Sequence, residues 1–375
     1  MLSLNTTKYS PPSPYQLSEL PKPTLGDSND VIIKVHAASI NPIDVKKASG
    51  VLKMALKDEF PYKIGYDCAG TVTEIGSNVS NLNVGDQVYT RLPETSRGSC
   101  SEFVSCPAKY VALKPPSLSF TDAASIPLAA MTALQALRRY NGDLAGKTVL
   151  IPAGLGGTGL FACQLAKHAF KAGKVITTVS TSKIPMVNEL LGDGTVDESM
   201  PAHLPPSSYQ NNQLTDPVID YTKDDPQNAI EPGTVDFLFD TVGSSMPYLS
   251  LMRPDTGCII SVSTLPSGDQ LQASSVMQLP HRPVLPMHVR VALNLMDSVR
   301  RLRAWRYGVN YSYMFLESSG EDLDYLRELV ESEKLRTVVG STANLRDVEA
   351  VKDLCQVVYS GKGGLGKAVI KVVDE

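Results

Sequence analysis

The pattern of hydrophobic and polar residues changes character about a third of the way along the chain. Before that point, short runs rich in β-branched residues, such as VIIKVHAAS (31–39) and DQVYTRL (86–92), are separated by prolines and glycines, which is typical of strands joined by turns. From Asp122 onward alanine and leucine dominate, and DAASIPLAAMTALQALRRY (122–140) predicts a helix that Pro127 interrupts. We therefore expect a β-rich region followed by a region that contains helices.

The middle of the chain alternates between strand-like and helix-like segments. KTVLIPA (147–153) and KVITTVS (174–180) predict strands on either side of a helix at 158–172, an order typical of a parallel sheet with crossover helices. VDFLFDTV (235–242) and GCIISVST (257–264) are almost continuously apolar, as strands covered on both faces are. The sequence thus predicts an α/β protein with a parallel sheet.

Two segments depart from this alternation. Residues 199–217 carry four prolines and many polar side chains, which predicts an exposed insertion loop. Residues 287–305 predict an amphipathic helix. Its apolar positions recur at helical spacing while arginines occupy the remaining arc: Val291, Leu295, Val299 and Leu302 against Arg290, Arg300, Arg301 and Arg303.

Composition restricts the class of protein. The net charge of −4 offers no overall basic field for nucleic acid, and no apolar run approaches the roughly 20 residues that span a bilayer. The opening MLSLNTTKYSPPSP (1–14) lacks the basic and apolar regions of a signal peptide. Six scattered cysteines favour free thiols in a reducing compartment. We expect a cytoplasmic protein that acts on a small molecule and binds neither nucleic acid nor membrane.

A glycine-rich turn carries the strongest chemical signal. In IPAGLGGTGLFACQLAK (151–167) the residues Gly154, Gly156 and Gly159 form a G-x-G-x-x-G frame between the predicted strand and helix. We expect Gly154 to permit the tight turn, Gly156 to let backbone amides approach a pyrophosphate, and Gly159 to let the helix lie close to its strand. A flexible joint is the alternative, but the strand–turn–helix context favours dinucleotide binding.

The end of the second strand of this unit indicates which dinucleotide is bound. An NAD site has a carboxylate there for the ribose hydroxyls, whereas this chain has hydroxyls and an ammonium group, Ser180 to Lys183, and no acid before Glu189. These groups suit a 2′-phosphate, so we expect NADPH; the alternative is that Lys183 is an ordinary surface lysine. The remaining predicted cofactor contacts are Gly157, Thr158, Tyr221, Val242 and Gly243. For the last two, in FDTVG (239–243), the alternative is a plain exit from the strand.

The order of motifs resembles the zinc-free quinone-oxidoreductase and enoyl-reductase branch of the medium-chain dehydrogenase/reductases. The matching segments are SINPIDVKKASG (39–50), GYDCAGTVTEIGSNV (65–79), VGDQVY (84–89), AASIPLAAMTAL (123–134), the glycine turn, VIDYTKDD (218–225), FDTVG and SGKGGLGKAVIKV (360–372). The resemblance implies a GroES-like β-rich domain built from both chain ends, residues 1–121 and 317–375, around an inserted Rossmann domain with a doubly wound parallel sheet, residues 122–316. Residues 1–10, where the family has its first strand, are polar, so we expect that strand to be poorly formed.

The presence or absence of a catalytic zinc ion distinguishes the main branches of enzymes that share this fold. The zinc alcohol dehydrogenases that share it have Cys-x-x-Asp and Gly-His-Glu, and the matching stretches here are Asn41–Asp44 and Gly65–Asp67, with Tyr66 in the histidine position. An amide and a phenol replace a thiolate and an imidazole, so two zinc donors are lost. We expect no metal.

Without a Lewis acid, reduction of a C=C bond conjugated to a carbonyl, or of a quinone, remains feasible. The resemblance implies that Asn41 faces the substrate and that Thr132 lies beside the nicotinamide, and Tyr66 is a further candidate donor in the pocket. The alternatives are a turn role for Asn41 before Pro42 and core packing for Tyr66. The tyrosine that some family enoyl reductases carry after NP-x-D is absent at 48–51, so the proton donor is open.

The functional hypothesis is an NADPH-dependent, zinc-independent reductase, in detoxification or as a trans-acting enoyl reductase. The rivals are a non-catalytic NADPH-binding protein and a carbonyl or alcohol oxidoreductase of the same fold. For the basic segment 276–310 we consider three roles: a wall of the substrate pocket, a surface for an acidic partner such as an acyl carrier protein, or a face of solvated arginines. We favour the solvated arginines. A homodimer is expected through an aromatic edge strand that contains Tyr311, Tyr313 and Phe315, unless the helix 287–305 covers that edge.

Overall fold

The computed structural model describes residues 1–191, 217–362 and 364–373, and these fold into two compact units. The first unit comprises Met1–Thr132, Gly268–Ala292 and Phe315–Glu375, and the second comprises Ala133–Ser267 and Leu293–Met314. The insertion loop expected at 199–217 lies outside the described residues except for Pro217. No helix in the described part of the chain is long and apolar enough to cross a membrane.

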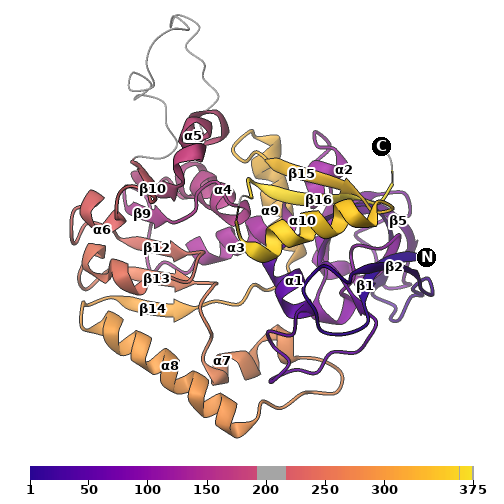
Figure 1. Cartoon of the computed structure of the whole chain (residues 1–375). Coiled ribbons are helices and arrows are strands. Elements are labelled where there is room, and N and C mark those ends of the chain that lie inside the picture. The colour runs from indigo at the N-terminus through magenta and orange to yellow at the C-terminus, as the bar shows by residue number, and fades with distance from the viewer. Residues whose placement is uncertain (192–216, 363, 374–375) are drawn as a thin grey trace, which may run out of the picture. The chain divides into compact units, whose positions relative to one another are not determined.

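The first unit is built on β-sheets (Figure 1). Its larger described sheet has the order β15-β16-β3-β5-β6-β8, with β7 also paired to β3. The bounds are β15 Val339–Asn344, β16 Lys367–Lys371, β3 Asp30–Ile40, β5 Asp67–Ile75, β6 Gln87–Arg91, β8 Val111–Leu113 and β7 Phe103–Pro107. Strands from both ends of the chain thus share one sheet, since β16 pairs antiparallel with β3.

A second, three-stranded sheet corrects one expectation. β1 (Leu2–Thr6) pairs with β2 (Gln16–Glu19) and β4 (Tyr62–Lys63), so the polar opening of the chain does form a strand. Leu4 supplies a buried apolar side chain. The buried polar side chains are satisfied internally, since the hydroxyls of Ser3 and Ser101 lie 2.6 Å apart and Asn5 donates to the Ser3 carbonyl at 2.9 Å.

Short helices close the first unit. They are α1 Pro42–Ala48, α2 Phe120–Ala124, α7 Gly268–Ala273, α9 Gly320–Glu331 and α10 Val348–Ser360, together with the start of α3 Pro127–Leu137, whose residues after Thr132 belong to the second unit. Pro127 does interrupt the expected helix, because α2 ends before it and α3 begins on it. The amide of Leu128 donates to the Asp67 carboxylate at 3.0 Å, which anchors the start of α3 on the first residue of β5.

The second unit contains a six-stranded parallel sheet in the order β11-β10-β9-β12-β13-β14. Its strands are β9 Thr148–Ile151, β10 Lys174–Val179, β11 Val218–Asp220, β12 Phe237–Asp240, β13 Cys258–Ser261 and β14 Asn310–Tyr313. Numbered from β9, this is the 3-2-1-4-5-6 order of a doubly wound dinucleotide-binding sheet. The expected α/β fold class is therefore confirmed.

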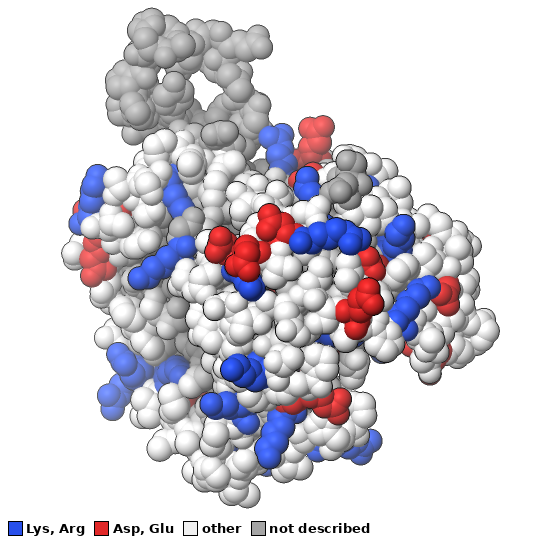
Figure 2. All heavy atoms as spheres, turned by 45° about the vertical axis from the view of Figure 1, so that its right-hand side comes forward, with Lys and Arg blue, Asp and Glu red and all other residues white. Residues whose placement is uncertain are grey.

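The second unit also contains the helices α4 Gly157–Gln164, α5 Ile184–Leu191 and α6 Pro226–Ala229, and α8 Met287–Trp305 begins in the first unit and continues in the second from Leu293. The helix expected at 158–172 ends earlier, because a π-helical turn, Leu165–Ala169, follows α4. The helix expected at 287–305 forms over those residues. Acidic and basic side chains are interspersed over the face drawn in Figure 2, and no single sign of charge covers it.

The compact units and the expected domain boundaries differ in three places. The first unit extends to Thr132 rather than to residue 121, it includes Gly268–Ala292, and it resumes at Phe315 rather than at 317. The bond between Leu128 and Asp67 gives the physical reason for the first difference, because it ties residues beyond 121 to β5.

Candidate functional site

The glycine-rich turn follows β9 and leads into α4, and close packing explains two of its glycines. A Cβ on Gly154 would stand 2.0 Å from the hydroxyl oxygen of Thr177 on β10, and a Cβ on Gly159 would stand 2.2 Å from the Ala153 carbonyl oxygen. The left-handed backbone of the turn falls on Ala153, with φ +57°. The expectation that Gly154 supplies the conformational freedom of the turn is therefore corrected: Gly154 is needed for space against the neighbouring strand.

The start of α4 fits a bound pyrophosphate. Gly156 is the N-cap and no side chain caps the helix, so the first amides, which include those of Gly157 and Thr158, keep their donors for an anion. A Cβ on Gly156 would meet only the Ala153 carbonyl oxygen at 3.1 Å, so this side of the turn is open to an approaching ligand. The residues present therefore fit the dinucleotide that the sequence predicts.

The carboxyl ends of β10 and β11 bring a second group of expected residues together. Tyr221 donates its backbone amide to the Val179 carbonyl at 3.1 Å, and the Thr181 hydroxyl lies 2.7 Å from that of Thr222. These bonds hold the segment that contains Ser180 and Lys183 beside the segment that contains Tyr221. The ring of Tyr221 is 56% exposed, and burial lowers the pKa of Lys183.

Asp220 places a carboxylate beside these residues, and its position could not be read from its place in the sequence. It is aligned with Val179 in the pairing of β10 with β11 and accepts the Thr181 hydroxyl at 2.6 Å. The hydrogen bond from Thr181, followed by that from Thr222, lowers the pKa of Asp220. An acid in this place suits ribose hydroxyls and repels a phosphate, so it acts against Lys183. The sequence shows Asp220 within VIDY (218–221). It does not show that this strand lies beside the end of β10, which is what brings the carboxylate to Thr181.

The turn after β12 adjoins the glycine turn. One oxygen of the buried Asp240 carboxylate accepts the amides of Val242, Gly243 and Ser244 at 3.3, 2.7 and 3.2 Å. Gly243 has φ +83°, a conformation that favours glycine. The Thr241 hydroxyl donates to the Pro152 carbonyl at 2.9 Å, which ties this turn to the end of β9. Val242 is exposed beside it.

In the first unit, Asn41 lies in a buried polar cluster. It precedes α1, its side-chain amide donates to Asp67 at 2.8 Å, and its side-chain oxygen accepts a hydrogen bond from Lys367 on β16. The backbone amide of Asn41 donates to Asp44 at 2.5 Å. Both ends of the amide are therefore fixed by charged partners, one of which comes from the other end of the chain.

Burial controls the ionisation of this cluster. Desolvation, followed by the charge of Asp67, raises the pKa of Asp44 from 3.8 to about 7. Desolvation also raises the pKa of Asp67 and lowers the pKa of Lys367. One carboxylate oxygen of Asp44 is buried without a hydrogen-bond partner, which a protonated carboxyl tolerates better than a carboxylate does.

Tyr66 belongs to a second buried network. Its hydroxyl donates to Glu94 at 2.6 Å, and Glu94 also receives Lys47 and Arg97, the latter at 2.5 Å. Burial raises the pKa of Tyr66, and the charge of Glu94 adds to the effect. The phenol is thus fully buried with its proton engaged. The sequence did not single out Glu94, because it lies 28 residues from Tyr66, at the start of a short 3-10 helix, Glu94–Ser96.

Thr132 lies in α3 and ends the first of the three chain segments that make up the first unit. It is buried, and its hydroxyl donates to the Leu128 carbonyl one turn earlier at 2.6 Å. The structure therefore satisfies this hydroxyl within its own helix.

The donors at the positions of the family's zinc ligands do not fit zinc. The Asn41 amide is bonded to Asp67 and Lys367, and the Tyr66 phenol is bonded to Glu94 with a raised pKa. Zinc selects thiolates, imidazoles and carboxylates, and neither side chain here is one of these. Among the described residues no group of three or more His, Cys, Asp or Glu side chains lies close enough to hold a metal ion.

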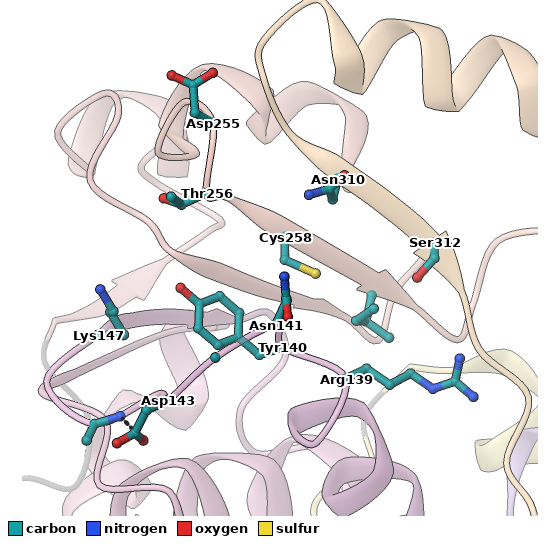
Figure 3. A pocket seen from close by; sticks show the side chains of 13 residues that line it. Arg139, Tyr140, Asn141, Asp143, Lys147, Asp255, Thr256, Cys258, Asn310 and Ser312 are labelled. Atoms are coloured by element: carbon teal, nitrogen blue, oxygen red, sulfur yellow. Dashed lines mark hydrogen bonds between the residues drawn. The ribbon is translucent and has the colours of Figure 1, made fainter.

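A cavity of about 790 Å³ opens in the second unit, away from the glycine turn. Figure 3 shows Asn141, Cys258, Asn310 and Ser312 around it. Cys258 and Asn310 begin β13 and β14, so the cavity lies toward the amino ends of these strands, whereas dinucleotides bind at the carboxyl ends. None of the predicted site residues lines it.

Comparison with known proteins agrees with this geometry. Residues 27–116 match the alcohol dehydrogenase GroES-like domain, and residues 215–362 match the zinc-binding dehydrogenase family. The chain is 31% identical over 336 residues to the mitochondrial NAD(P)H oxidoreductase RTN4IP1 of Homo sapiens, covering 85% of this chain and 77% of that protein. It is 34% identical over 238 residues to the 2-methylene-furan-3-one reductase of Solanum lycopersicum, covering 62% of this chain and 54% of that protein.

Among solved structures, the quinone oxidoreductase from Coxiella burnetii superposes with a TM-score of 0.75 at 29% identity. The superposition covers 100% of this chain and 99% of that one.

Proposed function

The chain belongs to the medium-chain dehydrogenase/reductase superfamily, and we propose that it is an NADPH-dependent, zinc-independent reductase of activated C=C bonds or quinones. The observation that carries this proposal is an intact dinucleotide cradle in a chain whose donors at the zinc positions are an amide and a phenol. The similarity to a reductase whose named substrate joins a methylene group to a ketone ring supports the C=C class.

The chain's own residues hold the cofactor in this proposal. The amides at the start of α4, from Gly157 and Thr158, bind the pyrophosphate, and Ser180, Lys183 and Tyr221 bind the 2′-phosphate. Thr132, Val242 and Gly243 contact the nicotinamide end. NADPH, when bound, supplies the hydride.

Asn41 is the proposed hydrogen-bond donor to the substrate oxygen on which negative charge develops. Its amide nitrogen has two hydrogens, and one is committed to Asp67. Because Lys367 bonds the other end of the amide, the second hydrogen is held in one direction, and a fixed donor of this kind stabilises an oxyanion without reorganisation. The proton for the α-carbon then comes from solvent or from a side chain.

The same contacts favour one rival function. Asn41 and Tyr66 are buried and bonded within the protein, as they would be in an NADPH-binding protein without turnover. A trans-acting enoyl reductase, with an acyl carrier protein as partner, stays within the proposal as one source of an activated C=C substrate.

The test is NADPH oxidation by the purified protein against a panel of enones, quinones and enoyl thioesters. We expect turnover of at least one class, unchanged by a chelator. Asn41→Ser keeps an oxygen before α1 but removes the amide donor, and we expect kcat/KM to fall by on the order of 100-fold. Asn78→Ala, which removes an exposed asparagine bonded only to Ser28, is the matched control and leaves the rate unchanged.

Tight NADPH binding by calorimetry without turnover of any substrate class would favour the non-catalytic rival. Stoichiometric zinc that is lost together with activity would refute zinc independence.

A further inference from the structure

Helix α8 places its apolar side toward solvent. Val291, Leu295, Val299 and Leu302, here called the α8 stripe, follow one another at helical spacing, and all four are exposed, Leu295 to 65% and Leu302 to 51%. The buried residues of the helix, Asp297 and Ala304, lie on the opposite side. An ordinary surface helix has the reverse arrangement, with its apolar stripe against the core.

The contacts of α8 with the rest of the protein come from its other side. The buried Asp297 is paired within the helix, with Arg301 one turn later at 2.6 Å, and Arg300 donates to the Leu265 carbonyl at 2.8 Å. Ala304 packs into the apolar core of the second unit together with Val309 and Tyr311. The helix is therefore attached through the Arg300 bond, the pair of Arg290 with Asp269 of α7 at 2.5 Å, and its inner side, where Val289 and Leu293 are half-buried, while the α8 stripe remains outside. Figure 1 shows α8 running beside β14.

The ends of the stripe extend the exposed apolar surface. Trp305, the single tryptophan of the chain, is 72% exposed at the end of α8, and Tyr307 follows it. Met287 is exposed at the start of the helix. A helix of 19 residues is about 28 Å long, so this is a continuous apolar ridge rather than a few scattered side chains.

The charge around the ridge indicates its partner. Residues 281–307 contain six arginines and one acid, Asp297, in a chain whose net charge is −4. Two copies of this basic segment would repel each other, which disfavours self-association through the stripe. Aliphatic residues and a terminal tryptophan flanked by arginines are what helices lying in the interface of an anionic bilayer present.

We propose that α8 docks this protein on an anionic lipid surface, with the α8 stripe and Trp305 among the acyl chains and headgroups. Arg303 and Arg306, which are exposed near the end of the helix, attract the phosphate and carboxylate groups of the lipids. This surface contact replaces the expectation, drawn from composition, that the protein does not meet a membrane. The protein docks on the bilayer without crossing it.

The test uses the full-length protein with vesicles of phosphatidylcholine containing about one third phosphatidylserine. We expect co-sedimentation, together with a blue shift of the Trp305 emission, and neither effect with pure phosphatidylcholine. High salt should weaken binding at least tenfold. The double variant Leu295→Ser/Leu302→Ser should bind at least tenfold more weakly, with unchanged NADPH-dependent turnover of a soluble substrate and an unchanged circular dichroism spectrum.

The matched control replaces two exposed valines elsewhere, Val51→Ser/Val84→Ser, at positions 63% and 60% exposed, and we expect it to bind like the wild type. The proposal would be overturned by the absence of a shift with anionic vesicles, by equal binding of the stripe variant, or by a shift that appears with protein concentration, together with a doubled mass, in the absence of lipid. The last would assign the stripe to a second copy. A shift with purified acyl carrier protein and none with vesicles would likewise overturn it and assign the stripe to an acidic protein.

Discussion

Asp44 shows how burial changes the chemistry of a single residue. Its carboxyl accepts the Asn41 amide beside Asp67 in a fully buried cluster. With one oxygen left without a partner, the neutral form is favoured in the folded protein, and its pKa rises to about 7. The group therefore couples protein stability to pH in a range where ordinary carboxyls are fully ionised.

We expect the free energy of unfolding to fall as pH rises from about 4 to about 7. The folded pKa lies above the unfolded one, so the folded protein binds the proton more tightly and loses this advantage as pH rises through the folded value. The effect is on the order of 1 kcal/mol for each unit by which the pKa is raised. Asp67, whose pKa is also raised, acts in the same direction.

The measurement is urea unfolding of the wild type and of Asp44→Asn between pH 5 and 7.5. The variant should show a flatter dependence in this range, because it cannot ionise. Glu94 affects stability in the opposite direction. Burial alone would raise its pKa, but the charges of Lys47 and Arg97 hold the pKa below 4.5, so the stability that Glu94 contributes is lost only as pH falls through that lowered pKa. Identical slopes for the two proteins would contradict the role of Asp44.

Lys183 and Asp220 oppose each other in the choice of cofactor. We expect Lys183→Ala to weaken NADPH binding roughly ten- to a hundredfold, because a charge-assisted contact is worth about 1.5–3 kcal/mol, and to leave NADH binding unchanged. Asp220→Asn keeps the acceptor for Thr181 but removes the charge, so it should strengthen NADPH binding.

Calorimetry with both cofactors measures these effects. Lys174→Ala, at the amino end of β10 and so away from the cofactor edge of the sheet, is the control and should alter neither affinity. Equal affinities of the wild-type protein for NADPH and NADH would contradict the preference for NADPH.

At the scale of elements, the glycines of the β9–turn–α4 unit have two different roles: one is needed for close packing, and another leaves room for the cofactor. Gly154→Ala would place a Cβ 2.0 Å from the Thr177 hydroxyl oxygen, and we expect it to destabilise the fold by about 1–3 kcal/mol. Gly156→Ala meets no atom closer than 3.1 Å. It should fold normally but bind NADPH at least tenfold more weakly, because its methyl group lies where the pyrophosphate approaches.

Thermal unfolding and NADPH titration of both variants check this division. The control is Gly364→Ala, where an added Cβ meets no atom within 4 Å and φ is not positive. It should change neither the melting temperature nor the affinity for NADPH. A stable Gly154→Ala protein with normal affinity would contradict the packing role.

At the scale of the whole molecule, the edge strand of the parallel sheet bears on assembly. β14 is the last strand in the sheet order. The amides of Asn310 and Met314 bond to Gly257 and Ser261 on the β13 side, so the alternate amides of Tyr311 and Tyr313 point toward the edge. An edge of this kind is an aggregation hazard unless it is covered or paired.

We predict a homodimer through this edge, which joins the two parallel sheets across a two-fold axis. Light scattering at micromolar concentration should give twice the chain mass of 40.4 kDa. Tyr313→Pro should shift the mass toward one chain, because proline removes an edge donor, while Val84→Ser should leave it unchanged. A wild-type mass near 40 kDa would reject the dimer and raise the odds of a reductase that docks with a carrier partner.

Local patterns were sufficient for much of this protein. The glycine frame, the nearly continuous apolar strands and the helical spacing at 287–305 each depend on neighbours within one element, and the six-stranded parallel sheet and α8 follow them. Such patterns predict elements because a helix or strand must repeat its buried positions at a fixed period. The same reasoning extended to the turn after β12, since carboxyl ends of parallel strands meet at one edge of the sheet.

Only the tertiary structure decided which distant side chains meet and which helix face is buried. Asn41 and Lys367 are 326 positions apart, Asp220 reaches Thr181 across 39 positions, and Glu94 reaches Tyr66 across 28. No period in the sequence encodes such pairs, because buried charges are positioned by whichever long-range partners offset their desolvation. For α8, the amphipathic pattern predicted the helix but not which of its sides is buried, because Asp297 and Ala304 face the protein and the α8 stripe faces solvent.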